Sequence, residues 1–301
     1  MYVAKHIGAL SLIAHGWRAV SLIALVVVVT SVVHIEQLDA GLKVSIAVAA
    51  VGTAVSFFIA FFTAQAYERW WEARKIWGEL VNDSRSFGRL VSTIFPSTDA
   101  QPEVARIQDR LVRRHIAYLY AVKSRLREEA QTESLAFLSE PDADRVRGSG
   151  HLGNALLQLQ GEDIDAAQRS DTIDVIRMAQ LNDMLNRFSS SMGAAERIKL
   201  TIFPPYYASM IRLSIWAYVV AFALALSEQI GYWSMPYVFV TGAIFQLVYD
   251  AGDLLLDPFE GRPNDIPMSS IVRTIEINLL EQIGEKQLPP PVEPVDGLYL
   301  M

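Results

Sequence analysis

The chain has 301 residues, of which 51% are hydrophobic and 20% charged, and its formal net charge is −7. A protein that binds nucleic acid would carry a basic stripe, so this acidic chain is not expected to have a nucleic-acid partner. Cysteine is absent, which excludes disulfide bonds, thiolate metal sites and thiol nucleophiles.

Four apolar stretches are candidates for membrane helices, because a helix that crosses the ~30 Å hydrocarbon core needs roughly 20 apolar residues. The first, residues 19–35, is short and strongly apolar, and no signal-peptide cleavage site follows it. Residues 44–66 contain no charged side chain, and the third stretch, 205–227, is interrupted by Arg212. The fourth, 229–249, contains Pro236 close to the expected start of its helix. The sequence therefore predicts four transmembrane helices.

Basic residues near the ends of these stretches predict the orientation in the membrane. The loop between the first two stretches has only Lys43, and residues 227–234 have no basic residue. The segment after the second stretch is much more basic, with Arg69, Arg74, Lys75, Arg85 and Arg89. Since basic residues accumulate on the cytoplasmic side, we expect a multi-pass protein of the cell inner membrane with both termini in the cytoplasm.

Residues 67–203 carry most of the charge and are expected to form a large cytosolic helical region. The second membrane helix is predicted to continue through residue 91, and residues 103–129 form an amphipathic helix with a run of arginines. We interpret that run as a solvated face with ion pairs between subunits, the alternative being binding of lipid headgroups or an anion. Residues 140–153 are predicted to be a linker, and a helix over residues 171–188 is expected to end at residues 189–193.

This organisation divides the all-α chain into four segments. Residues 1–66 hold the N-terminal segment and the first two membrane helices, and residues 67–203 form the cytosolic helical region. Residues 204–256 hold the third and fourth membrane helices, and residues 257–301 form a cytosolic C-terminal segment and tail. From Lys286 onward the tail has no core-forming pattern and is expected to be extended.

The densest motif follows the second membrane stretch, at residues 65–78, and reads QAYERWWEARKIWG. On a helix, Trp70 and Trp77 lie two turns apart on one face, and Glu72 is within reach of both Arg69 and Lys75. An interfacial tryptophan belt is the simple alternative, although it does not account for the interleaved charges.

This motif resembles the signature of bacterial members of the bestrophin family, and two further stretches agree. Residues 193–207, GAAERIKLTIFPPYY, are similar to the family pattern G-x-x-x-R-I-x-x-T-P-I-P-x-x-Y, and residues 256–260, LDPFE, resemble its (D/N)-P-F-(E/G) segment. Two positions depart from the family. Ile202 replaces a proline before the third membrane helix, and residues 62–64 replace a basic, amide-rich run, so the role of that run in ion permeation does not carry over.

The resemblance implies an ion channel that assembles as a homo-oligomer, with five subunits around a pore axis. Thr53, Phe57 and Phe61 recur at i, i+4 and i+8 on the uncharged second helix. They match the positions of the family's apolar neck, which gates by dewetting, whereas ordinary packing between helices is the alternative. Thr53 is polar where the family has an aliphatic residue. The resemblance also implies a second, cytosolic constriction near Ile176.

Arg212 lies within the third predicted membrane helix, and Asp250 and Asp253 follow the fourth. Ionisable groups at such positions usually pair or face water. We interpret Arg212 together with Asp250 or Asp253 as a structural ion pair, and a role in the ion pathway is the alternative. Asp257 and Glu260 match part of the calcium clasp of animal bestrophins. Because residues 261–263, Gly-Arg-Pro, stand where the completing acidic cluster would be, no calcium gate is expected.

No metalloprotease, P-loop, serine-hydrolase or dinucleotide-binding motif is present, and the histidines lack metal-ligand spacing, so no enzyme activity, catalytic residue, metal or cofactor is expected. The predicted function is passive conduction of small monovalent ions through the neck. The resemblance to the family favours anions such as chloride as the permeant ions, but the second helix carries no charge, so conduction of cations such as sodium is an alternative. A non-conducting membrane scaffold and a secondary transporter are the alternatives. The expected partners are other copies of the chain, membrane lipid and the permeant ions.

Overall fold

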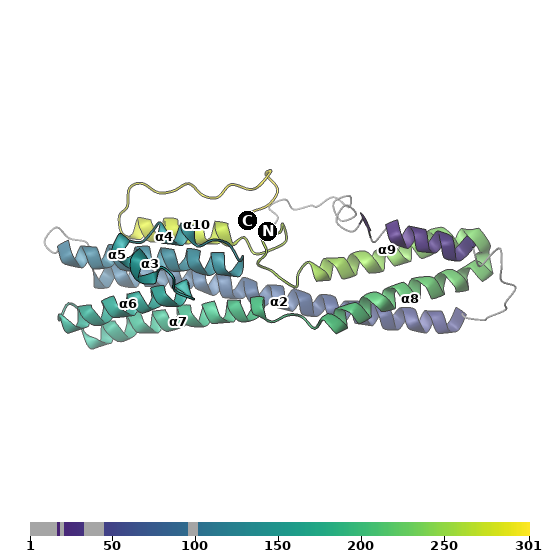
Figure 1. The fold of residues 1–301 in the computed structure, drawn as a ribbon, viewed down its shortest axis with the longest axis horizontal. Coiled ribbons are helices and arrows are strands. Elements are labelled where there is room, and N and C mark those ends of the chain that lie inside the picture. The colour runs from purple at the N-terminus through teal and green to yellow at the C-terminus, as the bar shows by residue number, and fades with distance from the viewer. Residues whose placement is uncertain (1–16, 19–20, 33–44, 96–101) are drawn as a thin grey trace. The chain divides into compact units, whose positions relative to one another are not determined.

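The computed structural model describes residues 17–18, 21–32, 45–95 and 102–301. Its regular secondary structure is helical over these residues, apart from one isolated bridge between Val295 and Tyr299, which confirms the all-α prediction (Figure 1). The chain separates into two compact units. The apolar unit comprises the described residues up to Trp70 together with Ile202–Leu256, and the bundle unit comprises Trp71–Thr201 and Asp257–Met301. The predicted loop around Lys43 lies outside the described residues.

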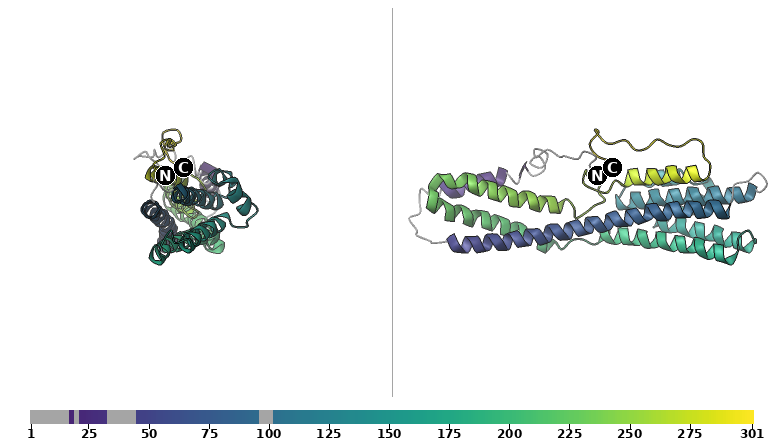
Figure 2. Two further views of the ribbon diagram at one scale, coloured as in Figure 1. Left: turned by 90° about the vertical axis from the view of Figure 1, so that its left-hand side faces the viewer. Right: turned by 180° about the vertical axis from the view of Figure 1, so that it is seen from behind.

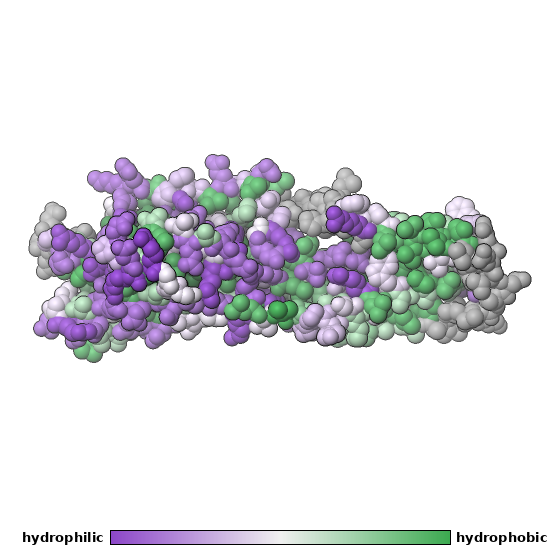
Figure 3. Space-filling model, viewed as in Figure 1, coloured by the Kyte–Doolittle hydropathy of each residue, from purple (hydrophilic) through white to green (hydrophobic). Residues whose placement is uncertain are grey.

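The apolar unit is built from the helix Ser21–Val32, the first part of α2 (Ser45–Ile94), α8 (Pro205–Ile230) and α9 (Ser234–Asp253). A single 3₁₀ turn, Gly231–Trp233, joins α8 and α9 into an antiparallel pair, and Gly231 has the positive φ of 57° that this turn requires. Two stretches, Val48–Ile94 and Pro205–Asp253, are long and apolar enough to cross a membrane, while Ser21–Val32 is shorter. Hydrophobic residues dominate the visible surface of this unit (Figure 3).

Glycines allow the helices of the apolar unit to approach closely. A Cβ atom on Gly242 of α9 would lie 2.9 Å from Val219 of α8. A Cβ atom on Gly52 of α2 would lie 2.7 Å from the ring of Tyr218. Small residues serve the same purpose in membrane helix packing generally, because apolar side chains gain little from leaving lipid and close contact of the backbones supplies the stabilisation.

Helix α8 begins at Pro205 even though Ile202 replaces the family's proline. The fixed φ of proline suits the first helical position, where no backbone N–H is needed, and Pro204 precedes it with extended backbone angles. Ile202 is exposed and does not pack into either hydrophobic core. The turn before the third membrane helix therefore forms without the first proline of the family pattern.

The bundle unit surrounds α3 (Pro102–Leu126) with the second part of α2, α6 (Leu152–Arg169), α7 (Val175–Leu200) and α10 (Met268–Gln282). Two shorter helices, α4 (Thr132–Leu135) and α5 (Glu140–Val146), lie between α3 and α6 in the sequence. Figure 2 shows these helices from the end and from behind. The buried side chains of α3 cover almost its whole circumference from Leu111 onward, as expected for the central helix of a bundle.

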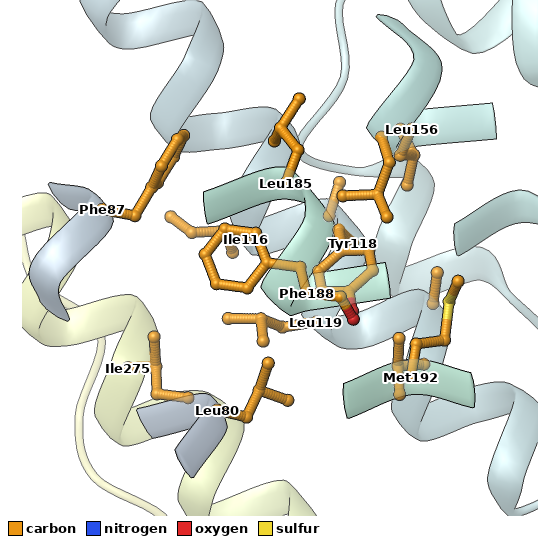
Figure 4. Close-up of a cluster of buried hydrophobic side chains, with 14 of the residues drawn as sticks. Leu80, Phe87, Ile116, Tyr118, Leu119, Leu156, Leu185, Phe188, Met192 and Ile275 are labelled. Carbon is orange, nitrogen blue, oxygen red and sulfur yellow. The ribbon is translucent and has the colours of Figure 1, made fainter. Parts of the chain in front are cut away.

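Aromatic rings from three helices meet in the core of the bundle unit (Figure 4). Phe188 of α7 packs against Phe87 of α2, with ring centroids 5.5 Å apart, and the hydroxyl of Tyr118 donates to the backbone oxygen of Phe188 at 2.7 Å. His115 is buried beside them and its Nε2 lies 2.9 Å from the hydroxyl of Ser84. Burial lowers the pKa of His115 to about 3, so this histidine is a neutral core residue.

Two predictions for the bundle unit were wrong. Helix α7 does not end at residues 189–193 but continues to Leu200, because Phe188, Met192 and Ala195 are buried on one face of it. Packing there outweighs the low helix propensity of the serines and Gly193. The predicted linker at 140–153 contains α5, which Ser139 caps by accepting from the N–H of Asp142. Pro141 occupies its first turn, where proline is tolerated.

Candidate functional site

The predicted neck residues lie on the exposed side of α2 within the apolar unit. Phe57 and Phe61 are each 60% exposed, and Thr53 is also exposed. The hydroxyl of Thr53 donates to the backbone oxygen of Ala49 at 3.1 Å, so its polarity is partly satisfied by its own helix. Three residues at this spacing share one face of a helix, and here that face is open.

The opposite side of α2 is fixed by Phe62, which is fully buried. Its ring stacks on Tyr249 of α9 and meets Phe203 edge-on, with centroids 4.8 Å and 5.4 Å away. A Cβ atom on Gly252 would lie 3.0 Å from the same ring, so a side chain at that point would press against it. The sequence analysis did not identify this anchoring role of Phe62. The signal was present, because Val55, Ile59 and Phe62 recur at helical spacing on one side.

Arg212 of α8 does not form the direct ion pair that the sequence predicted. Its Nη2 donates to the hydroxyl of Tyr249 at 3.4 Å, and its guanidinium lies 5.2 Å from the centre of that ring. Asp250 instead accepts from Nε2 of Gln246 at 2.8 Å. Within the described residues, neither Asp250 nor Asp253 lies within ion-pair distance of Arg212. The tyrosine ring takes the position next to the guanidinium that the prediction gave to a carboxylate.

Ile176, the predicted cytosolic constriction, lies in the first turn of α7 and is 72% exposed. The Asp174 side chain caps this helix by accepting from the N–H of Arg177 at 2.8 Å. Ile176 borders a groove of about 660 Å³ between α2 and α7. The groove is lined by Ser86, Arg89, Leu90, Thr93, Ile176, Ala179, Gln180, Asp183 and Met184.

A second groove between the same two helices, of about 560 Å³, shares Asp183 with the first and is more polar. Glu79 and Asp83 line it from α2, and Arg187 of α7 donates to Asp83 at 2.9 Å. Acidic and basic side chains therefore both border the open side of α2 and α7 in the bundle unit. This mixed charge does not by itself favour ions of one sign.

The arginine run of α3 forms ion pairs inside the chain; Arg106 is exposed, as the prediction of a solvated face requires, but Arg114 is buried and corrects that prediction at its position. Arg114 is buried and binds Asp142 and Asp163, each at 2.7 Å, and Arg110 also binds Asp163, at 2.6 Å. Burial alone would raise the pKa of Asp142, but the hydrogen bonds and charge of Arg114 lower it overall. Arg113 pairs with Asp109 and Glu285. The network therefore joins α3 to α5 and α6.

The acidic residues after α9 already have partners in the chain. Asp257 accepts from Nζ of Lys199 at 2.7 Å and from the N–H of Phe259 at 3.2 Å. Glu260 pairs with Arg262. Asp265 is buried, which raises its pKa to about 6 although the N–H of Arg262 donates to it. Within the described residues no group of three acidic or histidine side chains is arranged to hold a metal ion, and the absence of a calcium gate remains a prediction.

Comparisons with known proteins show what the chain is similar to. The family model described as Bacterial/Fungal Bestrophin protein matches residues 8–281. The voltage-dependent anion channel-forming protein YneE of Escherichia coli O157:H7 is 32% identical over 257 residues, covering 84% of this chain and 82% of that protein. The voltage-dependent anion channel-forming protein RSc3414 of Ralstonia nicotianae is 28% identical over 269 residues, covering 89% and 87%.

A solved structure agrees with these matches at the level of the fold. The crystal structure of a bacterial bestrophin homolog from Klebsiella pneumoniae superposes with a TM-score of 0.82 at 23% identity, covering 89% of this chain and 98% of that one. The family model and the E. coli relative both extend over most of the sequence, so the match is not confined to one motif. This chain belongs to the bestrophin family, in its bacterial and fungal branch.

Proposed function

We propose that this protein is a passive channel for small monovalent ions, with anions such as chloride preferred. The observation that carries the proposal is the open, uncharged face of α2, on which Phe57 and Phe61 are 60% exposed while Phe62 is buried. An apolar ring of this kind opposes the passage of hydrated ions by dewetting and supports a gate or filter rather than a binding pocket. The names of the relatives, which are anion channel-forming proteins, support the preference for anions.

The channel is a homo-oligomer in this proposal, with five subunits around the pore axis. The described helices of one apolar unit are too few to enclose a pore, and the wide exposed side of α2 includes Val51 and Phe58 as well as the neck residues. Part of this side faces the axis, and the rest contacts lipid or neighbouring subunits. Thr53, Phe57 and Phe61 form the neck, and Ile176 forms the second constriction at the far end of the pathway.

The apolar unit crosses the cell membrane in this proposal, with four spans, while residues 67–203 and both termini lie in the cytoplasm. The hydropathy of Val48–Ile94 and Pro205–Asp253 supports the spans. The basic residues after α2, such as Arg74, Lys75 and Arg89, support the orientation, because basic residues favour the cytoplasmic side. The four sequence segments, 1–66, 67–203, 204–256 and 257–301, then alternate between membrane and cytoplasm.

Reconstitution into liposomes tests this function. We expect purified protein to dissipate a chloride gradient without an added energy source, and the reversal potential in asymmetric sodium chloride to lie closer to that of chloride than to that of sodium. A non-conducting scaffold would give the flux of empty liposomes, and a secondary transporter would give flux that requires a coupled second ion. A reversal potential near that of sodium would support a channel but would show that it prefers cations, contrary to the proposed selectivity.

A further inference from the structure

A buried guanidinium at the C-terminal end of α3 has two donor atoms without an acceptor. The Arg127 side chain is only 5% exposed, and its Nη1 donates to the hydroxyl of Ser269 at 2.9 Å. Its Nε and Nη2 are buried, and the described residues provide no acceptor for either atom. These two nitrogens form the edge of the guanidinium on which parallel N–H groups bind an anion. Buried polar groups in folded proteins almost always have a partner.

The same guanidinium lies at the N-terminus of α10, a helix of 15 residues whose N-cap makes no side-chain hydrogen bond. In its first turn, the N–H groups of Met268, Ser270 and Ile271 donate to backbone oxygens of the chain. Over the residues that the structure describes, the N–H of Ser269 has no such acceptor. The positive end of the helix dipole therefore adds to the charge of Arg127 at the point where the Ser269 hydroxyl contacts it.

The charge of Arg127 is only weakly balanced by the chain. Its nearest carboxylate in the described structure is that of Glu129, which lies 3.8 Å from Nη1 and is half exposed. Asp257, another acid of the same unit, is already paired with Lys199. Gly261, with a φ of 85°, lies next to the guanidinium, and a Cβ atom on it would be 3.7 Å from Nε of Arg127. A buried cation without a close counter-charge is unfavourable, so an anion at this position would stabilise the fold.

We propose that Arg127, the hydroxyl and N–H of Ser269 and the N-terminus of α10 bind a small monovalent anion of the chloride class. A single positive side chain with Glu129 nearby favours one negative charge over two. The donors come from the end of α3 and the start of α10, and the loop with Gly261 covers them. Anion binding would therefore hold α3, α10 and the segment after α9 together, in the bundle unit and separately from the neck on α2.

Thermal unfolding of the purified full-length protein in detergent tests this site without any flux measurement. We expect the midpoint to rise saturably by several degrees as sodium chloride replaces sodium gluconate at constant ionic strength. The Arg127→Gln and Ser269→Ala variants should each lose most of this chloride-specific rise. Arg125→Gln is the matched control, because Arg125 is on the same helix but is partly exposed and paired with Glu196 at 2.7 Å, so it should keep the rise.

Equal unfolding midpoints in chloride and gluconate for the unaltered protein would overturn the proposal. A full chloride-specific rise in Ser269→Ala would also overturn it, and this second variant keeps the test decisive if Arg127→Gln does not fold. Crystals grown in sodium bromide supply an independent readout. A bromide anomalous peak next to Nε and Nη2 of Arg127 is expected. A carboxylate of a second copy in that place, with no bromide peak, would show that the acceptor is a neighbouring subunit and would contradict the anion site.

Discussion

Phe62 of α2 and Tyr249 of α9 stack face to face, with ring centroids 4.8 Å apart and an interplanar angle of 8°. Phe62 is fully buried by this contact, and the adjacent Phe61 is rotated about 100° around the helix and is exposed. This aromatic pair lies on the face of α2 that packs inward in the apolar unit, together with the buried Val55 and Ile59. The face that carries Phe57 and Phe61 is left open as a consequence.

Replacing Phe62 by alanine should destabilise the protein by about 3–5 kcal/mol, since it removes a buried ring and leaves a cavity against Tyr249. Thermal unfolding and the oligomeric state in detergent measure this effect. Phe58→Ala is the control, because Phe58 is on the same helix but exposed, and its replacement should cost less than about 1 kcal/mol. Equal losses in the two variants would mean that Phe62 does not anchor α2.

Arg212 should be coupled energetically more strongly to Tyr249 than to Asp250. The guanidinium contacts the hydroxyl and the ring of Tyr249, whereas Asp250 accepts from Gln246. A double-mutant cycle with Arg212→Met and Tyr249→Leu should give a coupling energy of about 0.5–2 kcal/mol in unfolding experiments. The cycle with Asp250→Asn should give a smaller value. A larger coupling to Asp250 would restore the ion pair that the sequence predicted.

The Arg114 network should make the bundle unit sensitive to acid. Because Arg114 lowers the pKa of Asp142 in the folded state, the unfolded state takes up a proton more readily. The pair therefore stabilises the protein fully above the ordinary aspartate pKa of 3.8, and this stabilisation is lost as the pH falls below it towards the lower folded value.

Arg114→Met should cost about 3–5 kcal/mol at pH 7, because it leaves Asp142 buried without its ion-pair partner, while Asp163 keeps only Arg110. The exposed Arg106–Glu103 pair provides the control, and Arg106→Met should cost less than about 1 kcal/mol. Unfolding midpoints of Arg114→Met and the unaltered protein, measured between pH 2 and pH 7, should differ by a constant amount above pH 3.8 and should differ progressively less below it. A constant difference over this range would show that the Asp142 carboxylate does not carry the effect.

The ionisation of Asp265 should destabilise the folded protein, in contrast to that of Asp142, because burial raises the pKa of Asp265 to about 6. Between the ordinary aspartate value of 3.8 and about 6 the folded state holds the proton more tightly, so stability falls as the pH rises through this window. A pKa raised by about two units lowers the free energy of unfolding above pH 6 by on the order of 3 kcal/mol.

Asp265→Asn removes this ionisation and should become progressively more stable than the unaltered protein between pH 4 and pH 7, as unfolding midpoints would show. The exposed Asp171 is a control site, where the same substitution should change the stability by less than about 1 kcal/mol. If the stability of Asp265→Asn follows that of the unaltered protein at every pH, Asp265 does not titrate in this window.

The sequence was sufficient to predict the structural elements that have a strong local residue pattern. The absence of proline and of turn residues in residues 67–91 predicted that the second membrane helix continues, and α2 is a single helix from Ser45 to Ile94. Pro236 indicated the start of a helix, and α9 begins at Ser234. The tail after Lys286 lacks a core-forming pattern, and it has no helix and only the isolated bridge between Val295 and Tyr299. Motifs alone identified the family that the comparisons established.

Features that depend on contacts between distant residues were not predictable from local patterns. Helix α7 passes through three serines and a glycine because Phe188 and Met192 are buried, and propensity alone does not contain that information. The partners of Arg114, Asp142 and Asp163, lie 28 and 49 residues away in the sequence. Arg212 was assigned a carboxylate partner by its charge, but a neighbouring tyrosine ring occupies that position.

The central claim is that Phe57 and Phe61 form the apolar neck of the pore, and chloride flux through liposomes containing the Phe57→Ala/Phe61→Ala variant tests it most directly. If the two rings line the axis, their removal widens and wets the constriction, so flux should increase several-fold while the oligomer stays intact. If they pack between helices, each truncation costs about 3–5 kcal/mol as a cavity, and assembly and flux should fall together. An intact oligomer with unchanged flux would equally contradict the neck.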